Sequence, residues 1–83
     1  MVNAVPSANM IGTKVYLHSG QEAGSIEELI IDPASGIVRF STIRTGENMS
    51  VLMPWAAMIF AKSKRAFVLT DKGEFILRGR EQR

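Results

Sequence analysis

Cysteine is missing from the sequence, and histidine occurs once, at His18. Without thiols the chain can form no disulfide and no thiolate zinc site, and it has no cysteine nucleophile. A single histidine also excludes a multi-histidine metal site within one chain, and it leaves His18 without a second His or Cys to work with. The sequence therefore predicts no catalytic residues, no bound metal and no cofactor.

Long apolar runs are absent too. The longest, residues 51–61, is interrupted by Pro54 and falls short of the roughly 20 residues that span a bilayer. The first ten residues carry no positive charge and are broken by Pro6 and several polar residues, so they do not form a targeting segment. These absences predict a cytoplasmic protein that does not insert into membranes.

The chain has 83 residues, which suits one domain and leaves no room for two cores. A domain of this size buries only about 60–65 % of the surface that its unfolded chain exposes, so its own core gives limited stability. Disulfides and metals are excluded as additional supports, and 46 % of the residues are hydrophobic. We therefore expect a homodimer, in which a second copy supplies further apolar contacts.

Charge is unevenly distributed, although the formal net charge is only +2. Four acidic residues follow one another with no basic residue between them: Glu22, Glu27, Glu28 and Asp32. The C-terminal part is basic and predicts a patch for an anionic partner, such as RNA or an acidic protein, at Lys62, Lys64, Arg65, Arg78 and Arg80. Two interpretations stay open: a solvated surface of uneven charge, or acidic and basic regions that pair between two copies.

Short apolar segments separated by turn signals predict an all-β domain, a small barrel of about six strands. The extended segments are residues 14–18, 25–31, 37–44, 49–53, 59–61, 66–70 and 75–77. Residues 55–58 are expected to form one short helical turn near Trp55. The domain is expected to cover residues 9–77, with a flexible arm at 1–8 and a polar tail at 78–83.

Three local patterns predict two turns and one irregularity in a strand. Asp32 can accept hydrogen bonds from the amides that follow it, and Gly36 can adopt a positive φ, so this stretch predicts a hairpin turn. Glu27 and Glu28 interrupt the alternation of the second strand, which predicts a β-bulge between them. Residues 71–73 predict a tight turn before the last strand.

Several strands carry apolar residues on both faces. One face must fill the barrel, and a second copy of the chain is the simplest cover for the other. The residues predicted to lie on this outer face and to mediate self-association are Ile30, Ile37, Ile43 and Phe67.

The order and spacing of these signals, from about Ala8 to Leu77, resemble the PRC-barrel family. The positions that carry the resemblance are Gly12, Gly20, Gly24, Asp32, Gly36, Pro54 and Trp55. The resemblance implies a barrel of about six strands, with the glycines at turns, Asp32 opening a turn and Pro54-Trp55 at a strand end. The family has no shared catalytic residues, so the resemblance assigns none, and the chain looks like the free-standing type of member.

These observations predict a non-enzymatic protein-interaction module that self-associates and docks on another macromolecule. The first alternative is an accessory module of the ribosome or of RNA that uses the basic C-terminal part. The second is a small-ligand carrier or an enzyme with its site at a dimer seam.

Overall fold

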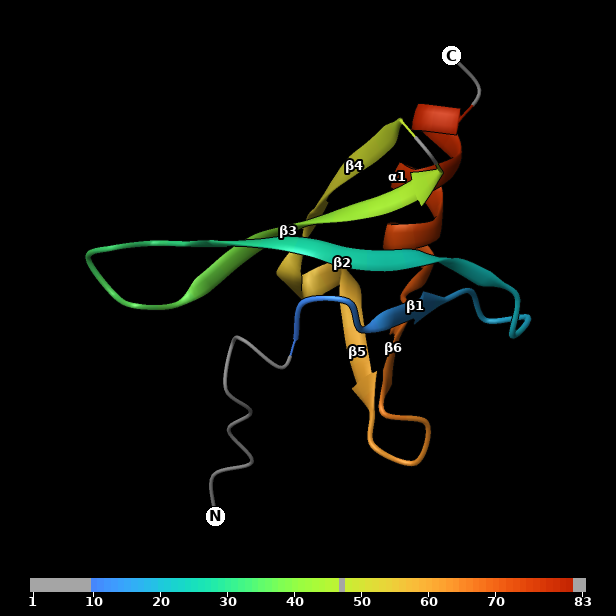
Figure 1. The fold of residues 1–83 in the computed structure, drawn as a ribbon, viewed down its shortest axis with the longest axis horizontal. Helices are drawn as coiled ribbons and strands as arrows, with labels where there is room; N and C mark the ends of the chain where they lie inside the picture. The colour runs from blue at the N-terminus through green and yellow to red at the C-terminus, as the bar shows by residue number, and fades with distance from the viewer. Residues whose placement is uncertain (1–9, 47, 82–83) are drawn as a thin grey trace.

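The computed structural model describes residues 10–46 and 48–81, whose strands form a six-stranded sheet curled into a half-barrel (Figure 1). The strands are β1 (Lys14–Tyr16), β2 (Glu22–Ile31), β3 (Val38–Gly46), β4 (Met49–Pro54), β5 (Met58–Ala61) and β6 (Ala66–Leu69). They lie in the order β4-β3-β2-β1-β6-β5, and all neighbours are antiparallel except β1 and β6. The 3-10 turn η2 (Trp55–Ala57) joins β4 to β5, and helix α1 (Asp71–Glu81) follows β6. The predicted β fold, with its helical turn near Trp55, is confirmed.

The core lies on the concave side of the sheet, where alternate strand residues point inward. The most deeply buried apolar side chains, each at most 2 % exposed, include Val15, Ile26, Ile43, Val51, Met53 and Leu69. Phe67 makes edge contacts with the rings of Trp55 and Phe60, at centroid distances of 5.3 and 5.1 Å. Leu77 of α1 closes this core, because the helix packs against β4, β6 and η2.

The hairpin between β2 and β3 follows the sequence prediction. The register shifts between Ile26 and Glu28, so Glu27 is the extra residue of a bulge. At the tip, the amide of Ala34 donates to Asp32 Oδ1 at 2.9 Å, and Gly36 has φ +74°. A positive φ is readily adopted by glycine, so Gly36 sets the direction in which the chain returns.

Gly24 corrects the expectation that it lies at a turn, because it is inside β2 and pairs with Val15 of β1. A Cβ at this position would collide with the carbonyl oxygen of Arg44 and would lie 2.9 Å from Ile43 Cγ2. Gly24 is therefore required by the close approach of β3, whereas Gly12 and Gly20 do lie in turns, as predicted.

The last predicted strand is wrong, and so is the tight turn before it, because residues 71–81 form helix α1. The hydroxyl of Thr70 accepts a hydrogen bond from the amide of Gly73 at 3.2 Å, the geometry of a helix N-cap. Gly73 allows the helix to approach η2, since a Cβ there would lie 2.6 Å from the carbonyl oxygen of Ala57. The helix continues to Glu81, so the predicted polar tail is helical over residues 78–81, and the predicted arm at 1–8 lies outside the described residues.

Candidate interaction surface

The convex face of β2, β3 and β4 carries an apolar cluster, called here the outer-sheet patch, made of Ile30, Phe40, Leu52 and Pro54. Ile30 pairs with Phe40 on the neighbouring strand, and Phe40 pairs in turn with Pro54, so these residues form a row across three strands. Ile30, Phe40 and Leu52 are 41 %, 37 % and 49 % exposed. The patch is continuous because paired residues on neighbouring strands point to the same face.

The period of two along each strand directs these side chains outward. On β3, Ser41 and Ile43 are buried, and Phe40 therefore points the other way. On β4, Val51 and Met53 are buried on either side of Leu52. The outward direction of the patch is thus the consequence of filling the core.

A polar network borders the outer-sheet patch and is centred on the bulge residue Glu27. The carboxylate accepts hydrogen bonds from Ser50 at 2.7 Å and from the Arg44 guanidinium at 2.8 Å, and Thr42 donates to it at 3.5 Å. The Ser50 hydroxyl and the Arg44 charge hold the pKa of Glu27 below its ordinary value. The network joins β2, β3 and β4 and gives the patch one charged edge.

Asp32 stabilises the turn beyond the other edge of the patch. The hydrogen bond from the Ala34 amide, together with the Arg39 guanidinium 3.3 Å from Oδ2, lowers the pKa of Asp32. Ile37 follows this turn and is 54 % exposed. The apolar face therefore lies between two paired acid–base groups.

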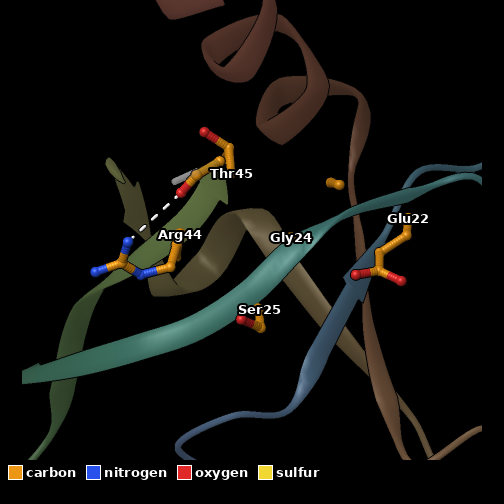
Figure 2. A pocket seen from close by; sticks show the side chains of 7 residues that line it. Glu22, Gly24, Ser25, Arg44 and Thr45 are labelled. Carbon is orange, nitrogen blue, oxygen red and sulfur yellow. Dashed lines mark hydrogen bonds between the residues drawn. The ribbon is translucent and has the colours of Figure 1, made fainter. Parts of the chain in front are cut away.

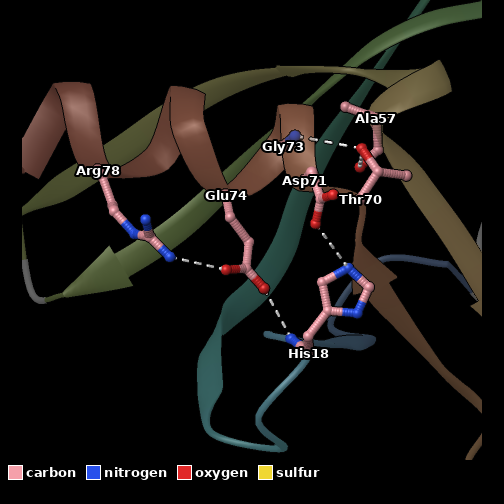
Figure 3. A network of polar contacts seen from close by, with 7 residues as sticks. All are labelled: His18, Ala57, Thr70, Asp71, Gly73, Glu74 and Arg78. Carbon is pink, nitrogen blue, oxygen red and sulfur yellow. Dashed lines mark hydrogen bonds and ion pairs between the residues drawn. The ribbon is translucent and has the colours of Figure 1, made fainter.

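His18 belongs to a separate network that ties the loop after β1 to α1 (Figure 3). Its backbone amide donates to the Glu74 carboxylate at 2.7 Å, and its Nε2 lies 3.4 Å from Asp71 Oδ1. Glu74 also accepts from Arg78 at 3.0 Å. Because Glu74 binds both the loop and its own helix, the arrangement has an evident structural role.

A shallow hollow of about 320 Å³ lies between the start of β2 and the end of β3 (Figure 2). Its lining residues are Glu22, Ala23, Gly24, Ser25, Arg44, Thr45 and Gly46. Glu22 pairs with Lys14 at 3.1 Å, Arg44 pairs with Glu27, and the buried Thr45 hydroxyl has no hydrogen-bond partner among the residues that the structure describes. Glu22 and Arg44 are the charged residues of this lining, and each pairs with a residue outside it.

In a comparison with known families, the model of the PRC-barrel domain matches residues 3–76. The chain belongs to the PRC-barrel domain family. The comparison with curated proteins gave no match. The PRC-barrel is a small domain of the interaction type and is not a known enzyme family.

Two further observations concern what this PRC-barrel domain lacks within residues 10–46 and 48–81. In that part of the chain, no cluster of three or more His, Asp or Glu residues could hold a metal ion. The helices described there include none that is long and apolar enough to cross a membrane.

The residues predicted to mediate self-association divide into two pairs in the PRC-barrel domain. Ile30 and Ile37 are exposed, as expected. Ile43 and Phe67 are 0 % and 3 % exposed, so the prediction that they lie on the outer face is wrong. Both belong to the core because the strand faces that carry them point into the half-barrel.

The predicted basic patch is not brought together. Lys62, Lys64 and Arg65 lie in the turn between β5 and β6, whereas Arg78 lies on α1 and pairs with Glu74. The turn and the C-terminal end of α1 lie at opposite ends of the molecule (Figure 1). The side chain of Arg80 is outside the described part of the structure.

Sequence reasoning missed most of the exposed large apolar residues, among them Phe40, Leu52 and Phe75. Leu52 stands between the buried Val51 and Met53, and Phe40 directly precedes the buried Ser41, so the alternation carried a usable signal once the buried face was known. Phe75 was placed on a strand that does not exist. Its exposure follows from the helical period of α1.

Proposed function

We propose that this chain is a non-enzymatic interaction module, which assembles with a second copy of itself and docks onto another protein through the outer-sheet patch. The observation that carries the proposal is the continuous row of exposed Ile30, exposed Phe40 and half-buried Pro54, with exposed Leu52 beside it. Exposed apolar patches bordered by polar groups are typical of protein contact sites.

The edge position of β4 adds to this surface. The strand is the last in the sheet order and contains no charged residue between Met49 and Pro54. Edge strands are usually protected by charges, bulges or a covering segment, and an uncharged edge favours contact with another chain. The patch and the edge of β4 are continuous through Leu52.

Photocrosslinking in the source cells tests the docking part. A benzophenone amino acid at position 40 reports on the patch, and the same amino acid at Lys64, in the distant β5–β6 turn, is the control. We expect an adduct with one partner protein from position 40, none from position 64, and loss of the adduct when Leu52→Lys is added. Equal adducts from both positions, or none beyond background from position 40, would contradict the proposal.

A further inference from the structure

Helix α1 has two features that the contacts of the described chain leave unexplained. Phe75 is 77 % exposed, more than any other large hydrophobic residue in the described part of the chain. Gly79 lies one turn further along, and a Cβ there would meet nothing within 4 Å. Only proline favours a helix less than glycine does, so Gly79 weakens α1 without making room for any neighbour among the described residues.

Gly73, in the same helix, differs from Gly79 because packing within the described chain requires a glycine there. A Cβ at Gly73 would lie 2.6 Å from the Ala57 carbonyl oxygen, so the monomer itself requires that glycine. Gly73 and Leu77 are buried and mark the inner side of α1. Phe75 and Gly79 are four residues apart and share the opposite side, because residues at this spacing are neighbours on a helix surface.

We propose that α1 pairs antiparallel with α1 of a second copy about a two-fold axis, and that Phe75 packs into the notch at Gly79 of the partner subunit. In a contact about a two-fold axis, the same surface of both subunits must fit itself. A face that carries a large side chain next to a notch meets this requirement, because each side chain can enter the notch of the other copy. Glycine also allows the two helix axes to approach closely, so the Phe75 ring can contact backbone. This inference rests on the self-association part of the proposed function and names its surface.

The charges on the flanks of α1 favour the same orientation. The first turn carries two acidic residues, Asp71 and Glu74, beside one lysine at position 72, whereas Arg78 lies in the second half of the helix. Antiparallel pairing brings the acidic turn of each copy towards Arg78 of the partner subunit, and it also opposes the two helix dipoles favourably. The Asp71 side chain is fully exposed even though His18 lies 3.4 Å away, so a partner subunit can also reach it.

The notch lies beyond the part of the chain that the family model matches, which ends at residue 76. Gly79 is therefore a feature of this chain outside the matched PRC-barrel region. The outer-sheet patch is on the sheet and α1 packs from the core side, so the self-contact leaves the patch free for a different protein.

Light scattering on the full chain with a Gly79→Leu variant separates this contact from general stability. Leucine fills the notch and blocks Phe75 of the partner subunit, yet it raises helix propensity, and its Cβ would meet none of the described residues within 4 Å. We expect wild type to approach twice its 9.1 kDa mass between about 10 μM and 1 mM, a range suited to weak interfaces. Gly79→Leu should weaken dimerisation at least about tenfold while its thermal midpoint at low concentration stays the same or rises.

Phe75→Ser is the second variant, and it removes the other half of the contact from an exposed position. It should also weaken dimerisation at least about tenfold, because the apolar side chain that fills the notch is lost. An unchanged dimer in both variants would overturn the inference.

Single introduced cysteines then locate the contact, since the chain has no thiol of its own. Arg78→Cys, beside the proposed two-fold axis, should form a disulfide-linked dimer under mild oxidation, and Leu52→Cys on the outer-sheet patch should not. If wild type is dimeric but only the Leu52→Cys variant forms the disulfide, the proposed contact between helices is wrong, while self-association itself is supported. A wild type that is monomeric over the whole concentration range would overturn both.

Discussion

Glu27 shows how a single residue can organise one face of this small sheet. As the extra residue of the β2 bulge, it collects hydrogen bonds from β3 and β4, which alternation alone would not bring to it. The bulge interrupts the backbone pairing of β2 with β3, and the Glu27 side chain compensates with hydrogen bonds that connect β2, β3 and β4. The energetic consequence is a carboxylate that is favoured in its charged form in the folded state.

Glu27→Gln should consequently lower stability at neutral pH and have little effect in acid. The pKa of Glu27 is lowered in the folded protein, so its stabilisation is present above the pKa of the unfolded chain and is lost as pH falls through the folded pKa. Thermal unfolding of both proteins across acidic to neutral pH measures this difference. Glu28→Gln is the matched control, because the neighbouring Glu28 is exposed. A gap between wild type and Glu27→Gln that widens in acid would contradict the assignment.

Gly24 is the residue at which one added methyl group should do most harm. Its Cβ would run into the backbone of β3, which cannot move without breaking the ladder. We expect Gly24→Ala to cost about 1–3 kcal/mol in free energy of unfolding, the usual range for overpacking. Urea titration gives the value, with Gly46→Ala as the control, where the nearest atom to an added Cβ is 4.0 Å away. Equal stability of the two variants would show that β2 and β3 can separate at Gly24.

At the scale of elements, strands were easier to predict than the helix. The alternation of β3 and β4 and the turn at Asp32 are local patterns, so the ends of these strands fall close to the expected positions. In α1, Gly73 resembles a turn residue and residues 75–77 resemble a strand, whereas Gly73 and Leu77 in fact lie on the side of a helix that packs against the core. The reason for Gly73 is the approach of Ala57, a contact between distant segments that no local pattern contains.

The interaction surface was predictable only in part for a similar reason. Alternation separates the residues of a strand into two sets, but it does not say which set faces the core when both are apolar. Ile43 and Phe67 were assigned outward for this reason, and Phe40 and Leu52 were not recognised. Only the curvature of the whole sheet decides which face of each strand points into the core.

The N-cap of α1 gives a prediction at this scale. Thr70→Ala removes the hydroxyl that accepts from the Gly73 amide and donates to the Ala57 carbonyl. Loss of an N-cap typically costs about 0.5–2 kcal/mol, and here the same group also joins the helix to η2. Chemical denaturation followed by circular dichroism measures the loss, and Thr70→Ser, which keeps the hydroxyl, should retain most of the stability. A Ser variant as weak as the Ala variant would assign the effect to the methyl group instead.

At the scale of the whole molecule, the two apolar surfaces have different consequences. The outer-sheet patch lies on the convex side of the half-barrel, while Phe75 lies on the solvent side of the helix that closes the concave side. A module with separate surfaces for itself and for another protein can present two copies of its docking face at once. Two linked docking faces bind a repeated or dimeric target more strongly than one face does, without any new contact.

Dimerisation through α1 should also couple stability to concentration. The helix closes the core through Leu77, so a partner that holds α1 in place stabilises the fold that presents the helix. Raising the protein concentration from about 10 μM to 1 mM should increase the thermal midpoint of wild type by about 2–6 °C, the size expected for mass action in a domain this small. Scanning calorimetry measures the midpoint at each concentration, and Gly79→Leu should show a midpoint that depends less on concentration than the wild-type midpoint does. A wild-type midpoint that stays constant while light scattering detects dimers would mean that the contact does not involve the helix that completes the core.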